Sequence, residues 1–507
     1  MKRRVLWMIL LAGLLALAQP VFASPVLRAE IDPRVWQELA DGSNAQWLVR
    51  LQEPTAGPAP FSSDASALQQ VEQRIQQAQS SQGGVRAQLT AAGIPFRAYW
   101  LVNVVAVSGD RSLLESLAAR PDVLYIESDR SFTVPLETPD AIQAPVAPSA
   151  IEPGLSLVHA PELWAAGIKG NGTVVASADT GVHWDHPALK SHYRGWNGTT
   201  ADHNYNWWDA IRTPVNPGSF NVCGIPPTTA PCDDYGHGTH TVGTIVGDDG
   251  LGRQIGMAPD AKWIGCRNMD NGVGRPSTYI GCLQFFIAPT DLNGNNPNPD
   301  LRPDVIDNSY SCPPNELCTA NSLHDAVVAV HAAGIFMSVS AGNSGSSTTC
   351  GTIKDPPAIE PLVFTVGGIN ALTGLIYEQS SRGPVDYGAV SYLKPALIAP
   401  AVSVNSSYMN SYASMTGTSM AAPHVAGAVA LLWSRFPTLR RDITATETLL
   451  QSTTTSFSTN ETCGGLPMGT VPNNTSGYGL LNVLTACSQQ NGKPCIPSRF
   501  FIPMVVK

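Results

Sequence analysis

The sequence is poor in charge, has no strongly basic stretch and contains no cysteine before position 223. Charged residues make up 14% of the 507 positions and hydrophobic residues 43%, which is typical of a packed globular protein rather than a disordered chain. The formal net charge is −9. Because binding to nucleic acid needs clustered Lys and Arg, we expect no nucleic-acid partner. The length suffices for a large core and a second, smaller domain.

Long apolar runs are also missing beyond the N-terminus. Three basic residues at 2–4 precede an apolar run over 5–18 and the small-residue pattern Val21-Phe22-Ala23. This arrangement is typical of a secretory signal peptide, so we expect residues 1–23 to be removed and the protein to be secreted to the extracellular space. A membrane anchor is the weaker interpretation, because a span needs about 20 apolar residues. We therefore expect no membrane span in the mature form.

The ten cysteines include no C-x-x-C pair, which disfavours a zinc ribbon or a thioredoxin-type redox site. Their number is even, and an exported chain meets an oxidising compartment, so we expect up to five disulfides. The sequence leaves the connectivity open. Neighbouring cysteines are the simplest candidate pairs: Cys223–Cys232, Cys312–Cys318 and Cys487–Cys495.

Four prolines in residues 135–149 indicate an exposed linker. Before it, residues 46–134 show strand and helix patterns in the order β-α-β-β-α-β, which predicts a small ferredoxin-like α+β domain in which the apolar run 99–107 forms one strand. After it, residues 150–486 alternate continuous apolar strands with helices. That pattern predicts an α/β domain whose mostly parallel central sheet is covered on both faces. Residues 487–507 form a C-terminal tail whose apolar end we do not explain.

Three segments carry residue types suited to nucleophilic catalysis. Asp179 ends an apolar strand, and ligands of open α/β sheets meet the carboxyl ends of strands. His237 lies between two glycines. Ser419 stands where a loop enters a helix, whose N-terminus offers free N–H groups and a partial positive charge. Taken singly, Asp179 could serve as a turn residue and Ser419 as a helix cap.

Together these residues form a consistent set. A serine hydroxyl is a poor nucleophile without an adjacent base, histidine is that base near neutral pH, and a carboxylate fixes its tautomer. A metal site built from His237 and His240 with Asp233 or Asp234 is disfavoured, because catalytic zinc takes three protein ligands and the chain has no H-E-x-x-H motif. We interpret His240 and His424 as structural histidines.

The motifs around Asp179, His237 and Ser419 resemble the subtilisin-like (S8) serine peptidases over residues 150–486, and the segments 185–189 and 203–209 look closest to the bacillopeptidase F branch. Residues 46–134 resemble the inhibitory propeptide (I9) of that family. The resemblance implies a three-layer subtilisin-like fold. It also implies that residues 24–149 are a propeptide, which acts as an intramolecular chaperone and inhibitor of a zymogen and is removed by self-cleavage near the Pro-rich linker.

The resemblance further implies a serine endopeptidase. Asn343 and the backbone N–H of Ser419 would form the oxyanion hole. Protein and peptide substrates would lie as an extended strand along two segments, and such backbone pairing depends little on sequence. The implied substrate-binding residues are Ser309, Tyr310, Ser311, Ser340, Ala341 and Gly342.

The chain departs from the family pattern at several positions. Ser311 replaces a usual glycine. Ala188 stands where many members have a calcium-binding Asp, and Gly250 replaces a typical loop ligand, so we expect no calcium in that loop, while structural calcium elsewhere stays open. We also expect that the enzyme requires no cofactor and is a monomer. An inactive scaffold protein of the same fold is disfavoured by the complete set of Asp, His, Ser and Asn. An acyl-transferring enzyme would use the same residues, so the sequence does not separate it from a hydrolase.

Overall fold

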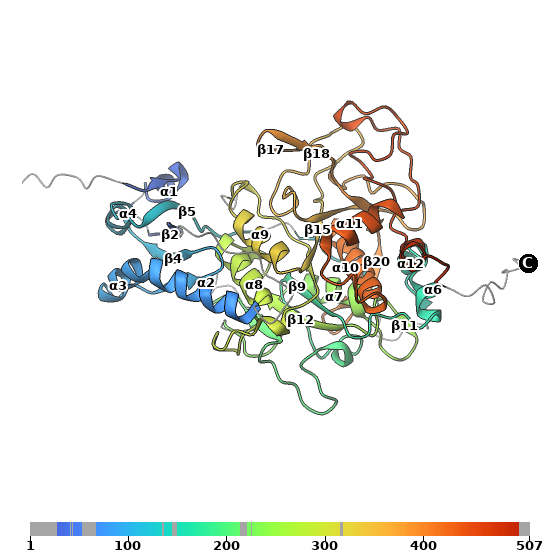
Figure 1. The fold of residues 1–507 in the computed structure, drawn as a ribbon, viewed down its shortest axis with the longest axis horizontal. Coiled ribbons are helices and arrows are strands. Elements are labelled where there is room, and N and C mark those ends of the chain that lie inside the picture. The colour runs from blue at the N-terminus through green and yellow to red at the C-terminus, as the bar shows by residue number, and fades with distance from the viewer. Residues whose placement is uncertain are drawn as a thin grey trace, which may run out of the picture.

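The computed structural model describes residues 28–40, 42, 44–52, 67–133, 136–143, 150–212, 221–224, 226–314 and 318–495. These residues form a smaller N-terminal unit beside a larger α/β domain (Figure 1). The predicted signal peptide and residues 496–507 of the predicted tail lie outside the described residues.

The N-terminal unit contains one five-stranded sheet in the order β1-β5-β2-β4-β3. Four of its strands are antiparallel neighbours, and with the helices they give the predicted β-α-β-β-α-β order, so the ferredoxin-like fold is confirmed. The elements are β1 (Glu30–Ile31), α1 (Pro33–Glu38), β2 (Ala45–Leu51), α2 (Ala67–Ser81), α3 (Gly83–Ala91), β3 (Phe96–Tyr99), β4 (Val104–Gly109), α4 (Arg111–Ala118) and β5 (Val123–Ser128).

The unit differs from the prediction in two places. It begins well before residue 46, because β1 pairs in parallel with β5 and Val35 of α1 is buried in the same core as Trp47. The single strand expected over 99–107 is two antiparallel strands joined by a turn at Asn103, which has a positive φ of 50°. Leu101 lies in this turn and is buried against the α/β domain, which explains why an apolar residue stands there.

The α/β domain has a central sheet of seven parallel strands, as predicted. Their order across the sheet is β10 (Trp207–Asp209), β12 (Lys262–Arg267), β9 (Val174–Asp179), β14 (Val305–Asn308), β15 (Phe336–Ser340), β16 (Phe364–Ile369) and β19 (Leu397–Pro400). The chain leaves β9 toward β10 and β12 on one side and continues with β14 on the other. The carboxyl ends of β9 and β14 therefore flank a topological switch point, where α/β sheets bind ligands.

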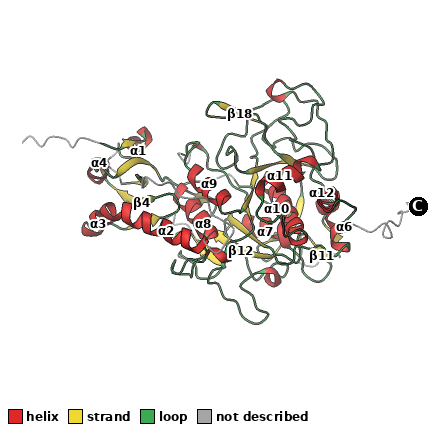
Figure 2. Ribbon diagram, in the orientation of Figure 1, coloured by secondary structure: helices red, strands yellow, loops and turns green. Residues whose placement is uncertain are grey.

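Helices cover both faces of this sheet (Figure 2). The α-helices of the domain are α5 (Pro153–Leu157), α6 (Ala160–Ala165), α7 (His237–Val246), α8 (Pro276–Ile287), α9 (His324–Ala332), α10 (Thr418–Arg435), α11 (Ile443–Ser452) and α12 (Val483–Asn491). Alternate strand residues face opposite layers: Val175 packs in one core with α7 and α10, and Ala176 in another with α8 and α9. The three-layer architecture is confirmed. α12 runs past residue 486 and buries Cys487, so the domain extends beyond the predicted boundary.

Short elements complete the description. Outside the central sheet lie β6 (Phe132–Thr133), β7 (Ala141–Gln143), β8 (Ala150–Ile151), β11 (Arg253–Gln254), β13 (Val273–Gly274), β17 (Val385–Tyr387), β18 (Val390–Tyr392), β20 (Val404–Tyr408) and β21 (Ser411–Met415). The 3-10 helices are η1 (Lys190–His192), η2 (Pro299–Leu301) and η4 (Cys463–Gly465).

The N-terminal unit sits on the amino ends of α8 and α9. Asp129, directly after β5, accepts a hydrogen bond of 2.8 Å from the backbone N–H of Ser277 in the first turn of α8. Arg50 forms an ion pair with Asp325 in α9. Asp129 meets the unpaired N–H groups and the positive end of the α8 dipole, and the ion pair of Arg50 with Asp325 adds a second contact, so the unit is fixed on the larger domain.

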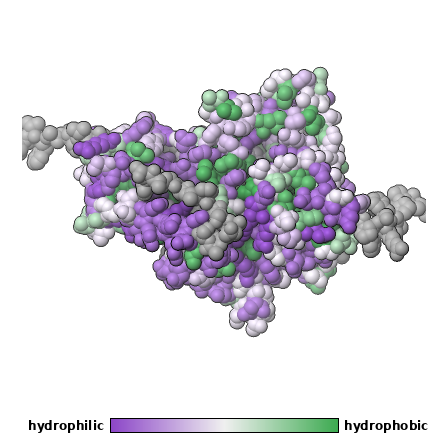
Figure 3. Space-filling view, viewed as in Figure 1, coloured by the Kyte–Doolittle hydropathy of each residue, from purple (hydrophilic) through white to green (hydrophobic). Residues whose placement is uncertain are grey.

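All ten cysteines are paired in five disulfides. The three predicted pairs are confirmed, and Cys266–Cys282 and Cys350–Cys463 complete the set. The face in Figure 3 is largely hydrophilic, with apolar side chains in small scattered groups. Within the described residues, no helix combines the length and the apolar character of a membrane span.

Candidate active site

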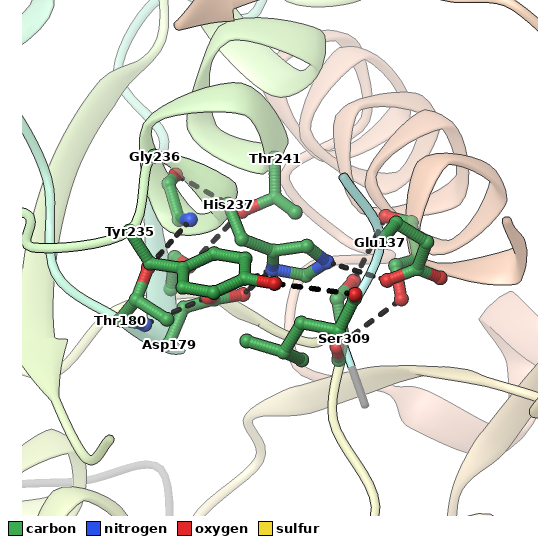
Figure 4. Close-up of polar contacts among 12 residues, drawn as sticks. Glu137, Asp179, Thr180, Tyr235, Gly236, His237, Thr241 and Ser309 are labelled. Atoms are coloured by element: carbon green, nitrogen blue, oxygen red, sulfur yellow. Dashed lines mark hydrogen bonds and ion pairs between the residues drawn. The ribbon is translucent and has the colours of Figure 1, made fainter. Parts of the chain in front are cut away.

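Asp179 and His237 meet at the carboxyl end of the central sheet. Asp179 ends β9, His237 begins α7, and the two carboxylate oxygens lie 2.8 and 2.9 Å from His237 Nδ1 (Figure 4). The flanking glycines are required sterically. Gly236 has a φ of 99°, and a Cβ on Gly238 would lie 2.1 Å from the carbonyl oxygen of Gly181. Glycine at both positions therefore lets His237 approach Asp179.

Asp233 holds this turn together. Its carboxylate accepts hydrogen bonds from the N–H groups of Tyr235, Gly236 and Thr239 and from the hydroxyl of Thr180. Among the described residues, no group of three or more His, Cys, Asp or Glu side chains is arranged to hold a metal ion.

The other histidines of these motifs are structural, as predicted. His240 is fully buried, and its Nε2 donates to the carbonyl oxygens of Val404 and Ala413, both at 3.1 Å. Burial lowers the pKa of His240 to about 3 and that of His424 to about 4, so both rings are neutral at physiological pH.

Ser419 is the second residue of α10 and lies at the same end of the sheet. Its hydroxyl donates to the carbonyl oxygen of Ser309, which follows β14, at 3.2 Å. The Nε2 atom of His237, on which a serine nucleophile depends, contacts a different residue: Glu137 Oε2 lies 2.9 Å away. The predicted side chains are therefore gathered at one place, with Glu137 inserted among them.

Glu137 belongs to the Pro-rich linker and was not among the predicted site residues. Its Oε1 accepts a hydrogen bond of 2.6 Å from the Nδ2 of Asn343, and its carboxylate also interacts with Ser419. Burial alone would raise the pKa of Glu137, but the hydrogen bond and charge of His237 outweigh it and hold that pKa below its usual range. The one signal in the sequence was an acidic side chain at the predicted processing site.

His237 responds to the same neighbours. Burial would lower its pKa, but the carboxylates of Asp179 and Glu137 hold the pKa well above its usual range. With carboxylates facing both ring nitrogens, the charged form of the imidazole is favoured.

Asn343 is oriented toward the same point. Its Oδ1 accepts hydrogen bonds from the backbone N–H and the hydroxyl of Thr418, at 2.9 and 3.1 Å, so its Nδ2 is directed at the Glu137 carboxylate. An amide donor fixed in this way beside a serine is suited to hold a developing oxyanion.

A cavity of 580 Å³ opens beside Ser419. All six predicted substrate-binding residues line it: Ser309, Tyr310, Ser311, Ser340, Ala341 and Gly342. Leu136 is buried and also lines this cavity, and the preceding β6 pairs antiparallel with β13. β13 was not predicted, because its only signal in the sequence is a valine between glycines.

A buried chain of hydrogen bonds supports Ser419 from behind. Pro423 lies in the second turn of α10 and has no N–H for the carbonyl of Ser419. The hydroxyl of Ser309 donates to that carbonyl at 3.0 Å, and Asp307 Oδ2 also lies 3.0 Å from the same hydroxyl. The Ser309 hydroxyl is placed to donate in both contacts, so its single hydrogen serves both unless the Asp307 carboxyl is protonated and donates in return. Burial, reinforced by the charge of Asp179, raises the pKa of Asp307 well above its usual range.

The loop in which many family members bind calcium has no oxygen ligand in the side chain at position 188. Ala188 is fully buried and packs with Ile255 and Tyr412. Whether calcium binds elsewhere stays a prediction.

The chain is similar to known serine proteases. The subtilase family model matches residues 170–479. Bacillopeptidase F of Bacillus subtilis is 34% identical over 406 residues, which are 77% of this chain and 26% of that protein. Subtilisin DY of Bacillus licheniformis is 31% identical over 56% of this chain and 85% of its own length, and the major intracellular serine protease of Bacillus subtilis is 30% identical over 55% and 74%. The chain thus spans about a quarter of bacillopeptidase F. It belongs to the subtilase family.

Proposed function

We propose that the protein is a secreted serine endopeptidase that hydrolyses peptide bonds through an acyl-enzyme on Ser419. The observation that carries this proposal is the hydrogen-bonded pair of Asp179 and His237 at the same point as Ser419 and the Asn343 amide. Family membership and the names of the relatives support it. The five disulfides support export.

The chemistry follows from this arrangement. Ser419 Oγ attacks the carbonyl carbon of the substrate while its proton passes to His237 Nε2. The oxyanion is stabilised by Asn343 Nδ2 and the Ser419 N–H. His237 then gives the proton to the leaving amine as the C–N bond breaks. Water hydrolyses the ester by the same steps in reverse, and Ser419 regains its proton. Asp179 holds the imidazole in position and stabilises its charged form.

The protein is made as a zymogen in this proposal. Residues 24–149 are the propeptide, and the bond between Leu136 and Glu137 is the first to be cut. Leu136 lines the cavity beside Ser419, while β6 and β7 hold the chain on either side. Glu137 delays the cut, because its carboxylate occupies the space of the oxyanion and keeps His237 protonated.

Activity is tested with purified protein and casein. The wild-type protein is expected to hydrolyse casein, to be inhibited by a sulfonyl fluoride and to retain activity in EDTA. The Ser419→Ala protein is expected not to hydrolyse casein and to keep its N-terminal unit attached. Hydrolysis of casein by purified Ser419→Ala protein would show that the nucleophile is assigned wrongly.

The processing site is tested separately by mass spectrometry of the mature wild-type protein during the first minutes of maturation. We expect a new N-terminus at Glu137. A first N-terminus elsewhere would contradict the placement of Leu136, without affecting the assignment of Ser419.

A further inference from the structure

The chain beyond Glu137 is held by a strand of the catalytic domain. β7 lies antiparallel to β21, with Ala141 opposite Ser414 and Gln143 opposite Tyr412. One residue earlier, the N–H of Asp140 donates to the carbonyl oxygen of Ser414 at 2.8 Å. Backbone contacts therefore continue well past the catalytic centre.

A side-chain contact accompanies this pairing. The hydroxyl of Thr416 donates to Asp140 Oδ2 at 2.5 Å. The same hydroxyl accepts a hydrogen bond of 2.9 Å from the N–H of Ser403, so its hydrogen is left for the carboxylate. Thr416 is thus positioned to recognise an acidic side chain.

β21 is fixed independently of the segment that pairs with it. On its other edge it pairs antiparallel with β20 along its full length. His186 Nε2 donates to the carbonyl of Ser411 at 2.8 Å and His240 Nε2 to that of Ala413 at 3.1 Å. The side chains of Tyr412 and Met415 are buried. A strand anchored in this way loses little freedom when another strand is added to it.

The segment 132–143 crosses the site in one direction. β6 lies on β13, Leu136 lines the cavity, Glu137 contacts His237, and β7 lies on β21. Counted from the bond after Leu136, Asp140 is the fourth residue on the carboxyl-terminal side. Residues 141–143 are the fifth to the seventh.

We propose that β21 is a binding strand for polypeptide substrates. It pairs with the stretch four to seven residues beyond the cleaved bond, and Thr416 favours an acidic side chain at the fourth position. This inference rests on the proposed endopeptidase function. Strand addition supplies affinity through main-chain hydrogen bonds and little side-chain selectivity, so the enzyme favours long, extended polypeptides over short peptides.

The first test uses the processed wild-type enzyme and synthetic peptides that begin at residue 130 of this sequence and carry Ala in place of Glu137. One peptide ends at Thr138 and one at Gln143. A third, of the longer length, has N-methyl groups on the amides of 140–143. We expect kcat/KM to be about 10-fold higher for the unmodified long peptide, as one or two net hydrogen bonds would give. The methylated peptide should behave like the short one.

Equal kcat/KM values for the three peptides would refute the binding strand while leaving the proposed function intact. If the wild-type enzyme cleaves none of them and no casein, the proposed function and this inference both fail.

The second test addresses Thr416. Long peptides with Asp or Asn at the fourth position are compared with the wild-type, Thr416→Val and Thr416→Ser enzymes. We expect wild type to favour Asp by about 3- to 10-fold, the range for a partly exposed hydrogen bond to a charged group. Thr416→Ser keeps the hydroxyl and should keep this ratio, whereas Thr416→Val should reduce it to about 1. An Asp preference that survives in Thr416→Val would show that Thr416 does not read this position.

Discussion

Asp307→Asn is expected to stabilise the protein relative to the parent, by an amount that grows as the pH rises, although it replaces an acidic residue beside the catalytic centre. Asp307 is fully buried in β14, and its Oδ1 has no hydrogen-bond partner among the described residues. The raised pKa of Asp307 favours the protonated carboxyl, which can donate to the Ser309 hydroxyl while that hydroxyl donates to the Ser419 carbonyl. Asparagine keeps a donor at the same position, because its Nδ2 replaces the carboxyl O–H.

The size of the effect follows from proton linkage. In the unfolded chain Asp307 titrates near its usual pKa of 3.8, whereas burial raises the pKa of the folded form well above that value. Between the two pKa values folding takes up one proton, so stability falls by about 1.4 kcal/mol per pH unit as the pH rises. The amide of the Asp307→Asn variant takes up no proton. The variant should therefore gain stability relative to the parent, by up to about 1.4 kcal/mol for each pH unit above 3.8, until the raised pKa of the folded form is reached.

The measurement is urea unfolding of both proteins at several pH values, in a Ser419→Ala background that prevents self-digestion. Ser309→Ala in the active protein is the companion variant. It removes the hydroxyl that holds the Ser419 carbonyl, so kcat should fall while the Asp307→Asn enzyme stays active. Parallel pH dependences for the parent and Asp307→Asn would mean that Asp307 is ionised in the folded protein and does not donate a hydrogen bond to Ser309.

Two further predictions concern the zymogen and the disulfides. The ion pair of His237 with Glu137 is complete only while both are charged, so its contribution is lost as the pH rises through the raised pKa of His237, and self-cleavage should accelerate toward alkaline pH. Glu137→Gln removes one of the two carboxylates that raise this pKa and should shift the acceleration to lower pH, as followed by gel electrophoresis; an unchanged pH profile in the variant would contradict this. Replacing Cys350 and Cys463 together by Ser opens a loop with a sequence separation of 113 residues and should cost about 2–5 kcal/mol of stability in denaturant unfolding; a loss below about 1 kcal/mol would show that the unfolded chain is not constrained by this bond.

Local patterns were sufficient for the parts of the fold and site that depend on local chemistry. The parallel sheet follows from continuous apolar strands, since both of its faces are covered. Asp179, His237 and Ser419 stand in short motifs whose glycines and helix start are visible in the sequence. Residues 99–107 were predicted as one strand because the run is apolar throughout. Leu101 in the turn is apolar because it contacts the α/β domain and not the core of its own unit.

The remaining features depend on contacts between distant segments. Asp307 reads as an ordinary strand residue, and its raised pKa depends on burial in the folded domain and on the charge of Asp179, more than a hundred positions away. The pairing of β7 with β21 joins segments separated by about 270 residues. Neither leaves a periodic or motif signal, because only the folded chain brings the partners together.

The position of Glu137 ties inhibition to catalysis through one residue, Asn343. A donor fixed to stabilise an oxyanion also binds a carboxylate, so Asn343→Ala should weaken both. Loss of this donor should lower kcat by about 10²–10³, the cost known for an oxyanion-hole asparagine of subtilisin.

The effect of Asn343→Ala on inhibition can be measured with peptides of residues 128–140 that carry Glu or Gln at position 137. These peptides compete with a small chromogenic substrate. For wild type the Glu peptide should bind about 10- to 150-fold more tightly than the Gln peptide, as for a hydrogen bond to a charged group. In Asn343→Ala this ratio should fall severalfold, while the contact with His237 preserves part of it. A ratio unchanged by Asn343→Ala would show that the carboxylate is held by His237 alone and that the oxyanion hole takes no part in keeping the zymogen inactive.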